Sequence, residues 1–106
     1  MAEITQDRME SAMEFLAETD KPYATGKAEL ERSEIARKRA RATAFLTTDG
    51  TVAERHAKAE MVPDVLEADD RYIAAIETFE TLKARRERAQ IVIEIWRSLN
   101  ASRRKV

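Results

Sequence analysis

The sequence predicts an all-α protein: a long antiparallel, coiled-coil-like helical hairpin with a short helix at its tip. Its 106 residues include only two Gly and two Pro, too few for the turns that a β-sandwich or an α/β fold requires. Hydrophobic residues make up 43% and charged residues 37% of the chain, a balance that favours long helices wetted on one side over a thick core. Two stretches also repeat apolar residues at heptad spacing, which indicates two long helices that pack side by side.

The second half of the chain carries the stronger heptad pattern. After Pro63 there is no further Gly or Pro, so one helix is predicted over residues 63–101. One member of its seam, Arg86, is polar. The apolar members, at 3-4 spacing, are Val65, Ala68, Tyr72, Ala75, Phe79, Leu82, Ala89, Ile93 and Trp96.

The first half has a weaker pattern that continues on both sides of Pro22. One heptad position holds Met9, Leu16, Tyr23, Leu30, Arg37 and Ala44. The intervening position holds the small residues Ala12, Thr19, Gly26, Ser33, Ala40 and Thr47. Two separate helices joined by a loop would not be expected to share one heptad register. A single helix is therefore predicted over residues 5–46. The alternative, in which Asp20 caps a separate second helix, stays open.

The clear break in the chain lies between these halves. Gly50 is placed to take a left-handed conformation after the first helix, and Thr51 to Glu54 match a capping box. A short tip helix is therefore predicted over residues 52–61. We expect one domain, made of the arms 5–46 and 63–101, this tip helix, and a basic tail over residues 102–106.

Placing the end of the first arm, Leu46, opposite the start of the second, Pro63, fixes an antiparallel register. In this register the two polar seam residues each face an aromatic ring, a contact worth about 0.5–2 kcal/mol. The predicted pairs are Arg37 with Tyr72, Arg86 with Tyr23, Leu30 with Phe79, and Met9 with Asn100.

Apolar residues extend beyond the seam at the open end of the hairpin. A helix that is apolar nearly all round is a buried helix, and a hairpin alone has nothing left to bury it. We therefore expect a homo-oligomer, with a dimer favoured. The residues predicted to mediate self-association are Phe15, Ile91, Val92, Ile95 and Leu99.

The charges do not mark the chain as a polycation, because 19 Lys and Arg nearly cancel 20 Asp and Glu. The basic run 37–41 is expected to pair across the hairpin with Glu67, Asp69 and Asp70 rather than to bind nucleic acid. The basic end of the chain is either a solvated tail or a weak, non-specific DNA contact. The residues that would make that contact are Arg97, Arg103, Arg104 and Lys105.

No catalytic residue, metal site or cofactor is predicted. Cysteine is absent, which excludes thiolate sites and cysteine nucleophiles. His56 and Glu60 could share a helix face, but two ligands do not make a metal site, so His56 is expected at the surface or packed into the tip. No serine has a base placed beside it by the sequence, and there is no Gly-rich phosphate loop.

The chain is expected to be cytoplasmic and not to enter a membrane. Its first residues lack the basic-then-apolar order of a signal peptide. Its most apolar stretch, residues 91–96, is interrupted by Glu94 and is too short to span a bilayer.

Two strings, VAERHAKA at residues 52–59 and IWRSLNASRRK at residues 95–105, resemble small uncharacterised proteins of tailed bacteriophages. Those proteins look like products of the early regions of phage genomes, where recombination and replication genes cluster. The resemblance implies an accessory role in phage DNA metabolism, in the host cytoplasm.

The function expected from these observations is that of a non-enzymatic helical accessory protein, plausibly phage-encoded. It would support DNA recombination or replication by binding a protein partner, DNA or both. The alternative is a pure interaction protein, such as an inhibitor of a host or defence enzyme, that binds no nucleic acid.

Overall fold

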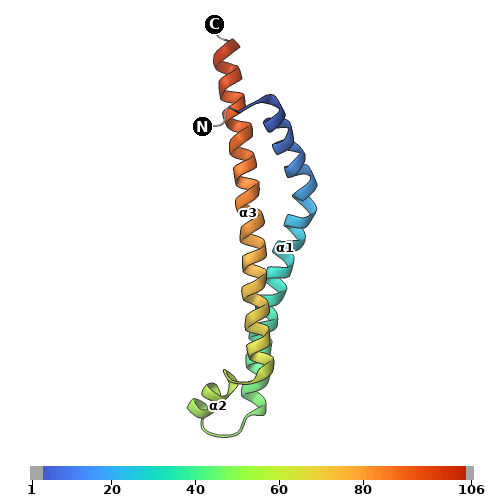
Figure 1. The fold of residues 1–106 in the computed structure, drawn as a ribbon. Coiled ribbons are helices and arrows are strands. Elements are labelled where there is room, and N and C mark those ends of the chain that lie inside the picture. Colours follow the sequence, from blue (N-terminus) through green and yellow to red (C-terminus); the bar gives the residue numbers. More distant parts are fainter. Residues whose placement is uncertain (1–3, 105–106) are drawn as a thin grey trace. The chain divides into compact units, whose positions relative to one another are not determined.

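The computed structural model describes residues 4–104, and its regular elements are three helices (Figure 1). They are α1 (Gln6–Thr47), α2 (Val52–Ala59) and α3 (Pro63–Arg104), with 42, 8 and 42 residues. The described part of the chain contains no strand. The predicted all-α hairpin, with a short helix between two long ones, is confirmed.

The helix bounds differ from the predicted ones by a few residues. α1 ends one residue later than expected and α2 ends two residues earlier. α3 continues past residue 101, so the first three residues of the predicted basic tail are helical. Lys105 and Val106 lie outside the described residues.

α1 runs through Pro22 without a break, which decides between the two alternatives for the first half. Proline lacks a backbone N–H, and its ring crowds the carbonyl one turn earlier. The continuous heptad phase outweighs this local cost, because a break would expose apolar seam residues on both sides.

The connection between α1 and α2 follows its predicted chemistry. Gly50 has a φ of +123°, a conformation that glycine adopts without strain. A Cβ atom at this position would lie 2.7 Å from Oε2 of Glu54. Thr51 is the N-cap of α2, and its hydroxyl accepts a hydrogen bond from the Glu54 amide at 3.2 Å. Pro63 begins α3, where its missing N–H costs nothing.

The chain divides by its contacts into two compact units, each with antiparallel segments of α1 and α3. Unit 1 comprises the described residues of 1–24 and 80–106, and unit 2 comprises residues 25–79. Each unit has its own buried cluster.

In unit 2 the core lies where α2 meets the two long helices. Ala44, Ala59 and Val65 are buried together there. Further along the unit, Gly26 lies against Phe79: a Cβ atom on the glycine would be 3.7 Å from the phenylalanine ring. A small residue on α1 thus lies against a large one on α3.

In unit 1 the core joins Met9 and Ala12 of α1 with Ala89 and Ile93 of α3. Met9 therefore lies about two helical turns before Asn100 along α3, and the predicted pair of Met9 with Asn100 is wrong. The register stays constant only if the angle between the two antiparallel helices does not change along their length. Pro22 disturbs the hydrogen-bond ladder of α1 and so can change the direction of that helix. As a result, the last turns of α3 extend past the start of α1 (Figure 1).

Arg86 of α3 lies in the seam of unit 1, against the turn of α1 that precedes Pro22. One nitrogen, Nη1, donates to the Leu16 carbonyl at 2.9 Å and to the Thr19 hydroxyl at 2.6 Å. Nη2 donates to Asp20 at 2.8 Å. The guanidinium also lies 5.0 Å from the centroid of the Tyr23 ring, which confirms the predicted pair. The Arg86 side chain is only 15% exposed, so these contacts satisfy a largely buried charge.

We expect Arg86→Met to lower the free energy of unfolding by about 2–3 kcal/mol, because it removes charge-assisted hydrogen bonds and the contact with Tyr23. Arg88→Met, at an exposed position of the same helix, should change it by less than about 0.5 kcal/mol. Urea unfolding followed by circular dichroism measures both. Equal losses in the two variants would show that Arg86 has no special role.

Candidate functional site

The basic run of α1 is largely occupied by contacts within unit 2. Arg41 donates to both oxygens of Asp69 at 2.7 Å, and to both oxygens of Glu60 at 3.0 and 3.2 Å. Glu60 directly follows α2, and Asp69 belongs to α3. One arginine therefore ties the tip helix to both long helices.

These contacts shift the titration of the groups involved. The hydrogen bonds that Arg41 donates to Glu60, and then those to Asp69, raise the pKa of Arg41. The hydrogen bond from Arg41 lowers the pKa of Glu60 below its ordinary value of 4.5. Of the three predicted carboxylate partners the structure selects Asp69. Glu67 and Asp70 form no ion pair within the described part of the chain. Glu60 was not predicted as a partner, because sequence spacing cannot place the end of a tip helix beside α1.

Two of the three neighbouring cations are also engaged; the third, Arg39, is exposed and forms no ion pair within the described residues. The Arg37 guanidinium lies 4.7 Å from the Tyr72 ring centroid, as predicted, and its Nε is 3.6 Å from Asp69. Lys38 pairs with Glu34 one turn earlier on the same helix, at 3.3 Å. The run is thus compensated mainly by its own fold, which argues against a nucleic-acid surface there.

The tip uses its histidine for packing. The His56 ring lies 4.5 Å from the Phe45 ring, between centroids. The Arg55 guanidinium lies 4.0 Å from the centroid of the same ring and donates twice to the Phe45 carbonyl, at 3.0 and 2.8 Å. The prediction of a tip-packing histidine is confirmed. Across residues 4–104 no group of three or more His, Cys, Asp or Glu side chains is placed to hold a metal ion.

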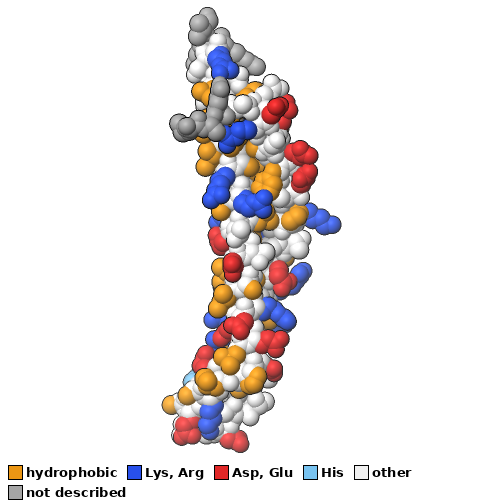
Figure 2. Space-filling view, viewed as in Figure 1, with side chains coloured by type: hydrophobic (Ala, Val, Ile, Leu, Met, Phe, Trp, Pro, Cys, Tyr) orange, Lys and Arg blue, Asp and Glu red, His pale blue; other side chains and the backbone are white. Residues whose placement is uncertain are grey.

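Unit 1 presents an apolar surface at its open end. Ile91, Ile95 and Leu99 of α3 are 52%, 42% and 44% exposed. Phe15 and Val92, the other two residues predicted to mediate self-association, are partly buried against the core of the unit. Figure 2 shows hydrophobic and basic side chains next to one another along the C-terminal part of α3, while acidic side chains gather on the neighbouring part of α1.

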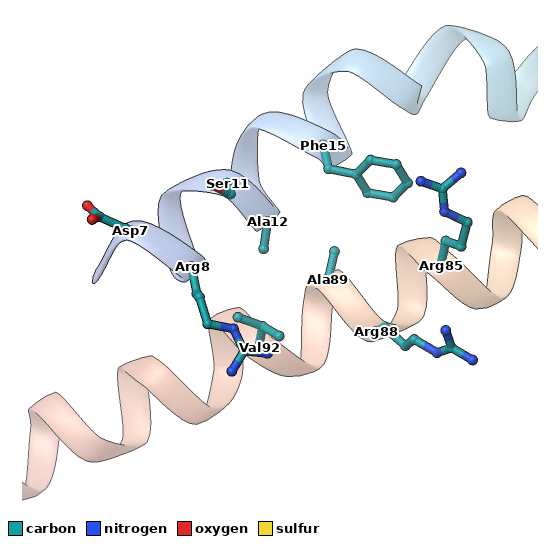
Figure 3. Close-up of a pocket in the computed structure, with 9 residues that line it drawn as sticks. All are labelled: Asp7, Arg8, Ser11, Ala12, Phe15, Arg85, Arg88, Ala89 and Val92. Atoms are coloured by element: carbon teal, nitrogen blue, oxygen red, sulfur yellow. The ribbon is translucent and has the colours of Figure 1, made fainter. Parts of the chain in front are cut away.

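A groove of about 470 Å³ lies between α1 and α3 on this surface. Ala12 and Ala89 face each other across it, and Phe15 lies beside the Arg85 guanidinium at one end (Figure 3). That guanidinium is 4.9 Å from the Phe15 ring centroid. The remaining lining residues are Asp7, Arg8, Ser11, Arg88 and Val92.

The basic end of α3 remains exposed. Arg97 and Arg103 are both exposed side chains on the helix. Arg104 is the last helical residue, and Lys105 lies outside the described residues. Three of the four predicted DNA contacts, Arg97, Arg103 and Arg104, thus belong to one continuous helix and not to a separate tail.

Comparisons of the chain with protein families, with characterised proteins and with solved structures find no match. The resemblance to phage proteins therefore stays a prediction. None of the helices described is long and apolar enough to cross a membrane.

We expect the tip helix to loosen as the pH falls. Because the pKa of Glu60 is lowered in the folded state, its interaction with Arg41 is fully present above pH 4.5 and disappears as the pH falls through the lowered value. Protection factors of α2 amides from hydrogen exchange should drop in that range. In Arg41→Ala they should already be low at neutral pH and change little on acidification; a full pH response in this variant would contradict the assignment.

Proposed function

We propose that this protein is a non-enzymatic helical accessory protein that acts by binding other protein chains through the open end of unit 1. The observation that carries the proposal is the exposed row Ile91, Ile95 and Leu99 on a helix whose opposite side already packs against α1. Contiguous exposed apolar side chains on a small protein mark an interaction surface. The first partner that we propose for this row is a second copy of the chain.

The chemistry of the groove supports a binding role over a catalytic one. Its lining has one hydroxyl, Ser11, and the one carboxylate of the lining, Asp7, points away from the groove (Figure 3). A nucleophile needs a base within hydrogen-bond reach.

The setting that we propose is phage DNA recombination or replication in the host cytoplasm. The support is the resemblance of residues 52–59 and 95–105 to phage proteins of early regions. A second function, weak DNA contact, is favoured by the exposed Arg97 and Arg103 at the end of α3. A pure interaction protein without DNA binding is the alternative that the experiments below distinguish.

The self-association is tested with Ile95→Glu. We expect the protein to be a dimer at tens of micromolar by sedimentation or light scattering. Ile95→Glu should weaken the dimer by about a hundredfold, because it buries an unpaired charge. Ile73→Glu, at an exposed isoleucine of unit 2, is the matched control and should leave the dimer intact. A monomeric wild-type protein at these concentrations would refute self-association.

The DNA contact is tested with the triple variant R103A/R104A/K105A. Wild-type protein should bind duplex DNA weakly, without sequence preference, and less tightly as salt rises. In a plot of the logarithm of the binding constant against the logarithm of the salt concentration, the slope of the triple variant should be smaller in magnitude. The difference should be roughly 0.9 for each phosphate that is no longer neutralised. Lys38→Ala should leave the slope unchanged, since Lys38 pairs with Glu34. Binding that depends on Lys38 and survives the triple variant would contradict this assignment, and no binding at low salt would favour the pure interaction protein.

A further inference from the structure

α3 carries a second heptad row beside the seam that packs on α1. Its members alternate in steps of three and four residues; the first three line the groove and the last two continue the row towards the end of α3. They are Arg85, Arg88, Val92, Ile95 and Leu99. A helix that shows two such rows can pack against two helices, and the structure supplies only α1 to the described part of unit 1.

The basic half of this row has no acidic partner among the described residues. The residues three and four positions from Arg85 and Arg88 include no carboxylate; they are Thr81, Leu82, Ala84, Ala89, Ile91 and Val92. Within residues 4–104 neither arginine forms an ion pair, and Arg85 contacts the face of Phe15. By contrast, Arg41 and Arg86 are both paired with carboxylates.

The two arginines stand three residues apart on one side of a helix, where like charges repel each other. The seam arginines Arg37 and Arg86 lie close to carboxylates, whereas Arg85 and Arg88 lie beside an apolar groove and form no ion pair within the described residues. A ligand that brings carboxylates to these positions would relieve the repulsion.

The shape of the groove points to the kind of ligand. Ala12 and Ala89 are buried between the two helices, and Phe15 and Val92 offer apolar contact beside them. Ile95 and Leu99 continue the apolar contact along α3. A groove between two helices, continued by a 3-4 row, matches recognition of an amphipathic helix.

We propose that this groove binds an acidic amphipathic helix of a partner protein. The partner's apolar face packs on Phe15, Val92 and Ile95, and carboxylates spaced by one helical turn pair with Arg85 and Arg88. The inference rests on the proposed function and names the chemistry of the partner.

The same row of a second copy does not satisfy the groove. If the row paired with itself in antiparallel fashion about Val92, Arg85 and Arg88 would meet Leu99 and Ile95 of the second copy. A parallel pairing would place arginine against arginine. Both arrangements desolvate a charge without a partner. Because the acidic helix and a second copy both need Ile95 and Leu99, the two should compete.

The probe is a fluorescently labelled synthetic helix of about three heptads, with Leu and Ala on one face and Glu at the flanks. A second probe carries Lys in place of every Glu. Fluorescence anisotropy with the full-length protein, at concentrations below self-association and at low salt, should show about tenfold or tighter preference for the acidic probe.

The variant R85E/R88E should lose that preference and bind the basic probe better instead. R32E/R39E is the matched control: it makes the same change in net charge at exposed positions of unit 2 and should bind like the wild type. Circular dichroism checks that all variants keep their helix content. The reversal of preference is the decisive result, since a folding defect would weaken both probes alike.

Three results would overturn the inference. The first is equal affinity of the wild-type protein for the two probes, and the second is an equal loss of preference in R32E/R39E. The third is that R85E/R88E loses self-association while the wild-type protein does not bind the acidic probe, which would make a second copy the occupant of the groove. If the acidic probe fails while wild-type protein still associates in an Ile95-dependent way, the proposed function stands and this inference falls. If self-association also fails, both fall.

Discussion

The packing of unit 1 depends on one arginine in an otherwise apolar seam. Arg86 spans about two turns of α1, from the Leu16 carbonyl to the Tyr23 ring, next to the proline that interrupts the hydrogen-bond ladder. A long, flat, always charged side chain suits this place, because it donates in several directions at once and stacks on an aromatic ring. An aliphatic residue there would pack against α1 equally well but would leave the turn before Pro22 without cross-helix hydrogen bonds. Arg86, the one polar residue of the heptad row on α3, thus stabilises the packing of α1 against α3.

Charge compensation is the second feature that holds the fold together, and Arg85 and Arg88, which are unpaired within the described residues, carry our proposal of a partner. In unit 2, Arg41 holds two carboxylates from different elements, so a tip helix of eight residues is fixed although it is too short to be stable alone. In unit 1 the same kind of side chain is left open at Arg85 and Arg88. A near-neutral chain thus uses some of its arginines, such as Arg41 and Arg86, in structural pairs and leaves others without an ion pair within the described residues.

The open end combines the features expected of a protein-binding surface. The exposed row Ile91, Ile95 and Leu99 supplies area, and the neighbouring arginines supply selectivity among partners. The proposed self-association and the proposed capture of an acidic helix use overlapping residues, so binding of a partner would be coupled to dissociation of the second copy. Such competition gives an accessory protein two states without any change in its own fold.

The sequence by itself determined the helical class, the three helices, the turn at Gly50 and the cap at Thr51, because these depend on neighbours within a few residues. It also predicted the pairs Arg37 with Tyr72 and Arg86 with Tyr23, since a heptad pattern sets which face of each helix is buried. Only the tertiary structure decided how far along α3 each residue of α1 lies. Met9 reaches the level of Ile93 and not of Asn100, because small changes of rise and direction around Pro22 add up over many residues and leave no mark in the spacing. For the same reason the clamp of Glu60 by Arg41, and the groove between Ala12 and Ala89, could not be read from the sequence: both depend on the positions of helices that are distant in the chain.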